Sequence, residues 1–131
     1  MISDKMKMTM ADYISEIPEV IKANIARAQS LTKPLVERFV QKPYKNIWIV
    51  GSGSSYNGAL CGRDFVKQVL GMDVRVITPA TFTYFENNIT DDDFVFVVSQ
   101  TGYSTNALAA LEVIKSKGLY TIGVTGDVES D

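Results

Sequence analysis

The chain has 131 residues, of which 46% are hydrophobic and 21% are charged, and its formal net charge at pH 7 is −2. This length and composition predict one globular domain rather than two, and the absence of a basic stripe argues against nucleic acid as the main partner. No apolar run has the length of a membrane span, and residues 1–10 lack the apolar core of a signal peptide. We therefore expect a soluble protein that binds neither membranes nor nucleic acid.

The chain contains no histidine and a single cysteine, Cys61. Histidine is the most common general base and metal ligand, so its absence argues against a metal site. Any acid–base chemistry within these residues is left to carboxylates, lysines, tyrosines or hydroxyls. One cysteine cannot form an internal disulfide, which fits a reducing cytoplasm. We expect Cys61 to be a small buried residue.

Residues 1–42 have the apolar spacing of helices and form a helical lead-in to the domain. Thr9 followed by Asp12 is a weak helix-capping signal. Pro18 fits the first turn of a new helix, and Pro34 marks a second break, because proline lacks the N–H that a helix interior needs. The pattern therefore predicts two or three helices.

From residue 43 onward the pattern changes to short apolar runs that end in loops. Runs rich in valine and isoleucine, apolar on both faces, are typical of parallel strands covered by helices on both sides. The four runs are residues 47–50, 74–77, 94–98 and 120–124. Helical stretches at about 55–70 and 104–117 stop at Gly71 and Gly118, which are C-cap signals. Residues 43–131 therefore predict a three-layer α/β domain with a flavodoxin-like parallel sheet, in which strands one and three are neighbours.

The fourth apolar run lies close to the end of the chain. It is apolar like a covered strand, yet no further run follows to pair with its far edge. We expect these residues to be a fragment of a longer polypeptide, with the domain incomplete at its C-terminal end. Two other features have structural interpretations: Trp48 is expected in the core, and the three aspartates at 91–93 are expected in a solvated turn.

Two hydroxyl-rich loops follow the first and third expected strands. The first is residues 51–58, with the sequence GSGSSYNG, and the second is residues 99–105, with the sequence SQTGYST. Each loop opens a helix, where free N–H groups and the helix dipole favour an anion. In the expected strand order, both loops lie on the crevice at the carboxyl ends of strands one and three. The alternative is that these serines only cap the helices.

Neither loop matches the common nucleotide-binding motifs. The dinucleotide fingerprint needs a glycine where Tyr56 stands and an acid near residues 77–79, and the P-loop needs a lysine where Ala59 stands. The loops also contain no arginine or lysine, so the donors to an anion are hydroxyls, one amide and backbone N–H groups. Several such hydrogen bonds can hold a phosphate monoester without a cation.

At these loops the sequence resembles the sugar isomerase (SIS) domain family, which includes the isomerase half of glucosamine-6-phosphate synthase, fructosamine-phosphate deglycases and bacterial phosphosugar isomerases. The resembling segments are residues 53–57 and 99–102, and residues 13–21 resemble the lead-in of the synthase-like members. The resemblance implies that the loops bind the phosphate of a small sugar phosphate. Carried over by position, the phosphate-binding residues are Gly53, Ser54, Ser55, Ser99, Gln100, Thr101 and Ser104.

The resemblance also indicates which reaction to expect. Synthases usually have a glutamate where Tyr103 stands, so this position favours a fructosamine-phosphate deglycase or an aldose–ketose isomerase over glucosamine synthesis. The family's catalytic glutamate, lysine and histidine would lie beyond Asp131, so we expect no catalytic residue among these 131 residues. We also expect no cofactor and no metal, since a positioned acid and base suffice to move a proton between C1 and C2.

The resemblance finally implies partners and an alternative role. We expect a cytoplasmic homodimer in which this domain pairs with a second SIS domain. SIS domains also occur in regulators that sense sugar phosphates, so a non-catalytic sensor is the alternative. Such regulators usually carry a DNA-binding domain ahead of the SIS domain, and residues 1–42 contain no basic recognition helix.

Overall fold

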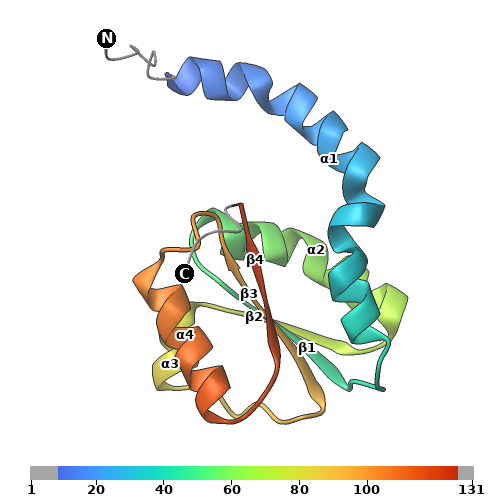
Figure 1. Ribbon diagram of the computed structural model, residues 1–131, viewed down its shortest axis with the longest axis vertical. Helices are drawn as coiled ribbons and strands as arrows, with labels where there is room; N and C mark the ends of the chain where they lie inside the picture. The colour runs from blue at the N-terminus through green and yellow to red at the C-terminus, as the bar shows by residue number, and fades with distance from the viewer. Residues whose placement is uncertain (1–8, 127–131) are drawn as a thin grey trace. The chain divides into compact units, whose positions relative to one another are not determined.

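The computed structural model describes residues 9–126, which belong to two compact units. One unit ends at Arg38 and consists of nearly all of helix α1, Met10–Phe39. The other begins at Phe39 and contains the remaining helices and strands (Figure 1). Their bounds are β1 Asn46–Gly51, α2 Ser54–Leu70, β2 Asp73–Ile77, α3 Pro79–Tyr84, β3 Asp93–Ser99, α4 Thr105–Ser116 and β4 Thr121–Thr125.

Helix α1 is one continuous helix of 30 residues, so the prediction of two or three helices is wrong. Its start confirms the capping signal, because Thr9 N–H donates to Asp12 Oδ2 at 2.7 Å and Asp12 N–H donates to Thr9 Oγ1 at 3.3 Å. Pro18 and Pro34 lie inside the helix. Each removes one backbone hydrogen bond while neighbouring residues continue the ladder, and the ribbon of α1 bends along its length (Figure 1).

The second unit is built on a four-stranded parallel sheet with the strand order β2-β1-β3-β4. This order confirms the flavodoxin-like prediction and makes β1 and β3 neighbours. Helix α2 packs against β1 and β2 on one face of the sheet, and helices α3 and α4 pack together on the other face (Figure 1). The three-layer α/β architecture expected from the apolar runs is therefore confirmed.

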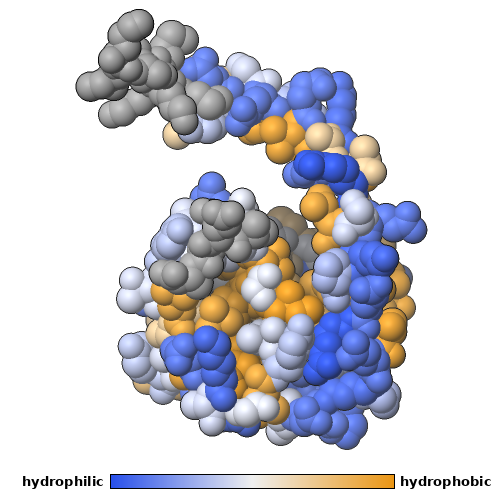
Figure 2. All heavy atoms as spheres, in the orientation of Figure 1, coloured by the Kyte–Doolittle hydropathy of each residue, from blue (hydrophilic) through white to orange (hydrophobic). Residues whose placement is uncertain are grey.

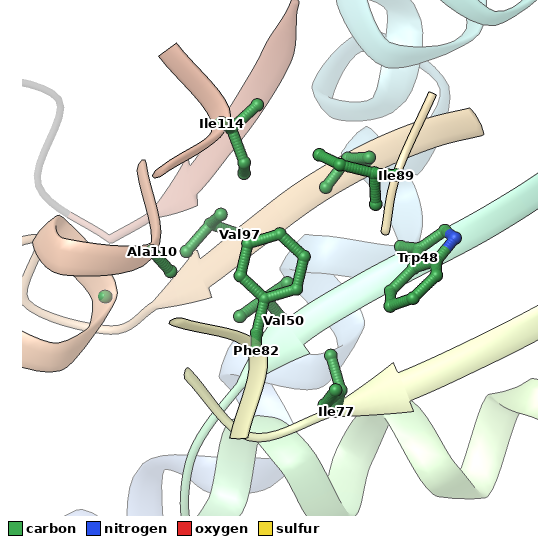
Figure 3. Close-up of a cluster of buried hydrophobic side chains, with 10 residues drawn as sticks. Trp48, Val50, Ile77, Phe82, Ile89, Val97, Ala110 and Ile114 are labelled. Carbon is green, nitrogen blue, oxygen red and sulfur yellow. The ribbon is translucent and has the colours of Figure 1, made fainter. Parts of the chain in front are cut away.

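The main core lies between the sheet and helices α3 and α4. Phe82 of α3 is fully buried, and its ring meets the Trp48 ring edge-on at a centroid distance of 6.0 Å. Figure 3 shows Phe82 surrounded by Val50 and Val97 from the sheet and by side chains of α4. Trp48 is 5% exposed, which confirms that it belongs to the core.

Helix α3 was not predicted, because its six residues are too few to show a helical period. Its signal is local: Thr78 is the N-cap, and its Oγ1 accepts a hydrogen bond from the Thr81 N–H at 3.3 Å. Pro79 occupies the first turn, where its missing N–H costs nothing. This short helix matters because it carries Phe82 into the core.

The expectation that Cys61 is buried is wrong. Cys61 is exposed on α2, which has no buried residue. The helix meets the sheet through half-buried positions such as Leu60 and Val66. Because successive helical residues are rotated by about 100°, Cys61 lies on the outer side of α2.

The aspartates at 91–93 lie at the amino end of β3, away from the hydroxyl-rich loop at its carboxyl end. Asp92 is exposed and pairs with Lys45 at 2.6 Å, and this hydrogen bond lowers the pKa of Asp92 and raises the pKa of Lys45. Asp93 Oδ1 accepts hydrogen bonds from the side chains of Asn46 at 2.8 Å and Trp48 at 3.3 Å. These contacts tie β3 to β1 and give the cluster a structural role.

Candidate functional site

A crevice of about 210 Å³ lies at the carboxyl ends of β1 and β3. The sheet register explains its position: Gly51 at the end of β1 pairs with Val98, one residue before Ser99. Both hydroxyl-rich loops therefore leave the sheet at the same level. The crevice brings together every site residue expected from the sequence, and its lining is Ser52, Gly53, Ser54, Ser55, Val98, Ser99, Gln100, Thr101 and Ser104.

A tight turn carries the chain from β1 into α2. Ser55 N–H donates to the Ser52 carbonyl at 3.1 Å, and Gly53 has φ 56° and ψ −128°. These angles are those of the first central position of a type II′ turn, which glycine adopts without strain. A Cβ on Gly51 would lie 3.3 Å from the Ser55 Cβ, so the glycine lets the start of α2 approach the strand end.

Hydroxyl groups of the second loop hold its backbone. Ser99 Oγ accepts a hydrogen bond from the Gly102 N–H at 3.2 Å, and Thr101 Oγ1 accepts one from the Tyr103 N–H at 3.2 Å. A hydroxyl that accepts through a lone pair keeps its own proton available for donation. Ser99 and Thr101 are therefore ordered by their loop and can each donate to an acceptor in the crevice.

The end of β4 also fixes the second loop. Gly126 N–H donates to the Gln100 carbonyl at 3.0 Å, and a Cβ on Gly126 would lie 3.0 Å from that same oxygen. A side chain at this position would require the Gln100 carbonyl to move by a few tenths of an ångström. Because the bond is made by the backbone of Gln100, the amide side chain of Gln100 remains exposed at the crevice.

Neither helix that opens on the crevice is capped by a side chain. Gly53 is the N-cap of α2 and Ser104 is the N-cap of α4, and neither position makes a side-chain capping hydrogen bond. Across residues 9–126, the hydroxyls of Ser54, Ser55 and Ser104 make no hydrogen bond with the protein. The alternative that these serines only cap helices is therefore not supported. First-turn N–H groups and free hydroxyls at two helix starts together favour an anion.

No charged side chain of residues 9–126 lines the crevice. The available donors are hydroxyls, one amide and backbone N–H groups, which suit a phosphate monoester. None of them is a general acid or base near neutral pH, so the lining can position a ligand but does not itself move protons. Within residues 9–126, no group of three or more histidine, cysteine, aspartate or glutamate residues could hold a metal ion.

Two lining residues, Ser52 and Val98, lie outside the expected set. Ser52 was recognisable as part of the first hydroxyl-rich loop, whereas Val98 belongs to a strand and carries no polar side chain that could have marked it. Tyr103 lies in the second loop but does not line the crevice, and its side chain is 55% exposed.

The fold and the crevice together define a three-layer α/β domain with a hydroxyl-lined crevice at the carboxyl ends of its strands, and a family model identifies its family. The SIS domain model matches residues 42–131, so the chain belongs to the SIS domain family. The part of the chain between residues 9 and 126 has no helix that is both long and apolar enough to cross a membrane.

Curated proteins similar to this chain include glutamine–fructose-6-phosphate aminotransferase (isomerizing) from Clostridium tetani (strain Massachusetts / E88). It is 30% identical over 127 residues, which cover 92% of this chain and 21% of that protein. The protein of the same name from Aquifex aeolicus (strain VF5) is 29% identical over 92 residues, covering 70% of this chain and 16% of that protein. The chain thus spans about a fifth or less of the length of these relatives.

Among solved structures, a protein assigned as a phosphosugar isomerase from Clostridium difficile 630 superposes with a TM-score of 0.77. The two sequences are 27% identical, and the match covers 94% of this chain and 34% of that one. The chain is therefore related to phosphosugar isomerase domains.

Proposed function

We propose that this domain binds the phosphate group of a sugar phosphate in the crevice between its two hydroxyl-rich loops. One observation carries the proposal: the seven expected residues meet in a single crevice at two helix starts that no side chain caps. The donors in this proposal are the hydroxyls and backbone N–H groups of both loops and the Gln100 amide. The relatives, named for fructose 6-phosphate and for phosphosugar isomerisation, agree with this ligand class.

We further propose that the domain belongs to an aldose–ketose isomerase or a fructosamine-phosphate deglycase. Holding the phosphate at one end of an open-chain sugar orients C1 and C2 for proton transfer, which lowers the entropic part of the barrier. The acid and base would come from outside the crevice lining. Tyr103 stands where synthases usually have a glutamate, and it favours the deglycase or isomerase over the synthase.

A homodimer that pairs SIS domains is also part of the proposal. Strand β4 lies at one edge of the described sheet, and Val124 on this strand is 40% exposed. Figure 2 shows hydrophobic residues at the surface in the region of β4. An apolar strand at a sheet edge is normally covered by another element, which supports pairing with a further domain.

The phosphate group itself is expected to supply most of the affinity. Fructose 6-phosphate should bind in isothermal titration calorimetry, whereas fructose should bind poorly, because hydrogen bonds to a charged group contribute about 1.5–3 kcal/mol each. Inorganic phosphate serves as a control for the contribution of the sugar. Equal affinities for fructose 6-phosphate and fructose would contradict the proposal that the crevice binds the phosphate group.

The pH dependence of binding is expected to follow the ligand and not the protein. A phosphate monoester has a second pKa of about 6, and none of the described side chains that line the crevice is titratable. The dianion is the better acceptor, so affinity should fall by about tenfold from pH 7.5 to pH 5, as its share of the ligand drops. A sugar sulfate, whose charge is constant over this range, should bind with unchanged affinity. If the affinity for the sugar sulfate also changed with pH, a titrating group of the protein would be responsible instead.

A further inference from the structure

A second pocket lies at the carboxyl end of β2, beside the crevice. Ile77, the last residue of β2, pairs with Val50 of β1, and Tyr56 of the pocket directly follows Ser55 of the crevice. Neighbouring strands are about 4.8 Å apart, so the pocket and the crevice are neighbours on the same edge of the sheet. The pocket has a volume of about 290 Å³, which is at the small end for ligand pockets. Its polar lining residues are Tyr56, Arg75, Thr78, Thr81 and Glu86.

The guanidinium group of Arg75 is held in place but has unused hydrogen-bond donors. Arg75 pairs with Trp48 in the register of β1 and β2, and its Cζ lies 4.5 Å from the centroid of the Trp48 ring. Such stacking on a buried indole fixes the guanidinium plane. Among residues 9–126, no group accepts a hydrogen bond from this guanidinium, and the side chain is 45% exposed. A fixed guanidinium with free N–H groups is suited to bind a carboxylate through two parallel hydrogen bonds.

Glu86 places a negative charge beside this guanidinium. Glu86 Oε2 lies 3.8 Å from Arg75 Nη1, a distance longer than a hydrogen bond. The nearby carboxylate of Asp73 is already paired with Lys67 at 2.9 Å. A ligand that is only an anion would be repelled by Glu86, and a ligand that is only a cation would be repelled by Arg75. A ligand with a carboxylate next to an ammonium group would meet both charges favourably.

Hydroxyl groups on the wall of the pocket add a further donor. The Oγ1 atoms of Thr78 and Thr81 lie 2.9 Å apart, within hydrogen-bond distance. Because each hydroxyl has one proton, whichever of the two donates leaves the proton of the other free. The pocket can therefore offer a hydroxyl donor to a carboxylate oxygen in addition to the N–H groups of Arg75.

We propose that this pocket binds an α-amino-acid group, with its carboxylate on Arg75 and its amino group on Glu86. The site is separate from the phosphate crevice and uses none of the residues that line the crevice. An amino-acid group has two sources: a free amino acid, or the amine part of a fructosamine phosphate whose phosphate lies in the crevice. The second source rests on the proposed function.

The test compares four ligands by isothermal titration calorimetry of the whole chain. They are glycine, fructose 6-phosphate, and the 6-phosphates of fructose carrying either glycine or methylamine through nitrogen at C1. The glycine conjugate should bind at least about tenfold more tightly than the methylamine conjugate, because only the glycine conjugate has a carboxylate for Arg75. Saturable binding of glycine without this preference would instead identify a free amino acid as the ligand.

The outcomes separate this inference from the crevice assignment. If fructose 6-phosphate binds, but glycine does not and the two conjugates bind equally, the inference is overturned and the crevice assignment stands. If glycine binds and fructose 6-phosphate does not, the crevice assignment fails and the amino-acid site stands. If none of the four ligands binds, both are overturned.

Substitutions assign the charges of the pocket. Arg75→Gln should abolish the preference for the glycine conjugate and leave fructose 6-phosphate binding unchanged. Arg63→Gln is the matched control, because Arg63 lies on α2, pairs with Asp64 at 2.9 Å and does not line the pocket.

A second variant is needed because Arg75 also stacks on Trp48 and its loss can affect folding. Glu86 is 55% exposed, so Glu86→Gln should retain the wild-type thermal unfolding curve. It should weaken binding of the amino-acid ligand by about tenfold, as expected for the loss of a hydrogen bond to a charged group. Wild-type affinity for the glycine-bearing ligands in folded Glu86→Gln and Arg75→Gln chains would overturn the proposal.

Discussion

Replacing Phe82 with alanine is expected to lower the free energy of unfolding by about 3–5 kcal/mol, the usual cost of removing a buried phenylalanine side chain. Phe82 is fully buried, meets the Trp48 ring edge-on and lies beside Val50 and Val97 (Figure 3). Truncation would leave a cavity between α3 and the sheet, because the strands and α4 are held by their own packing. The measurement is urea unfolding of the whole chain, followed by circular dichroism.

The matched control for this prediction lies three residues further along the chain. Phe85 is 81% exposed, and its N–H, which donates to the Thr81 carbonyl at 3.0 Å, is retained in any substitution. Phe85→Ala should therefore change the stability by less than about 0.5 kcal/mol, as for surface positions in general. Equal losses for the two variants would show that Phe82 is not a packing centre of the domain.

Replacing Ser99 with alanine is expected to weaken fructose 6-phosphate binding by about 10- to 100-fold, the equivalent of one hydrogen bond to a charged group. The Ser99 hydroxyl accepts a hydrogen bond from the Gly102 N–H at 3.2 Å while its proton remains free to donate to a ligand. The alanine variant loses the hydroxyl donor and also loses the hydrogen bond that the Ser99 hydroxyl accepts from the Gly102 N–H. Both effects act on the crevice, so the change should exceed that for a serine with one role, such as Ser55.

The control for Ser99 is a serine of α4 that lies away from the crevice. Ser116 Oγ donates to the Val113 carbonyl at 2.7 Å near the end of the helix and is exposed. Ser116→Ala should leave the dissociation constant for fructose 6-phosphate unchanged in the same calorimetric titration. The thermal unfolding curve of Ser99→Ala shows whether the domain remains folded. A folded Ser99→Ala chain with wild-type affinity would exclude Ser99 from the phosphate site.

The shape of the crevice depends on a part of the chain that is distant in sequence from both loops. The N–H of Gly126, which follows β4, donates a hydrogen bond to the Gln100 carbonyl at 3.0 Å. Because β4 pairs with β3 in register up to Ser99 and Thr125, the strand and the loop are positioned as one piece. The proposed site is therefore a property of the assembled sheet and not of two independent loops.

The pattern of apolar runs and hydroxyl-rich loops was enough to predict the sheet and the place of the crevice. Alternation of apolar runs with helical stretches is a local pattern, and parallel strands joined by helices follow few topologies. Once β1 and β3 were neighbours, the loops at Gly53 and Ser99 had to meet at the same edge. The residues of the crevice could therefore be named without coordinates, because each lies within a few positions of a strand end.

Features that depend on the surroundings of a residue could not be predicted from the sequence and became visible in the folded chain. Pro18 and Pro34 read as helix breaks, yet α1 continues through both because the hydrogen bonds of the neighbouring turns are retained. Cys61 is exposed because α2 meets the sheet through other positions. Ser104 stands at a helix start without capping it, whereas Ser99 accepts from Gly102, and these roles follow from loop angles that composition does not specify. Spacing along the chain encodes which residues come together, but the backbone geometry at each residue decides which hydrogen bonds they make.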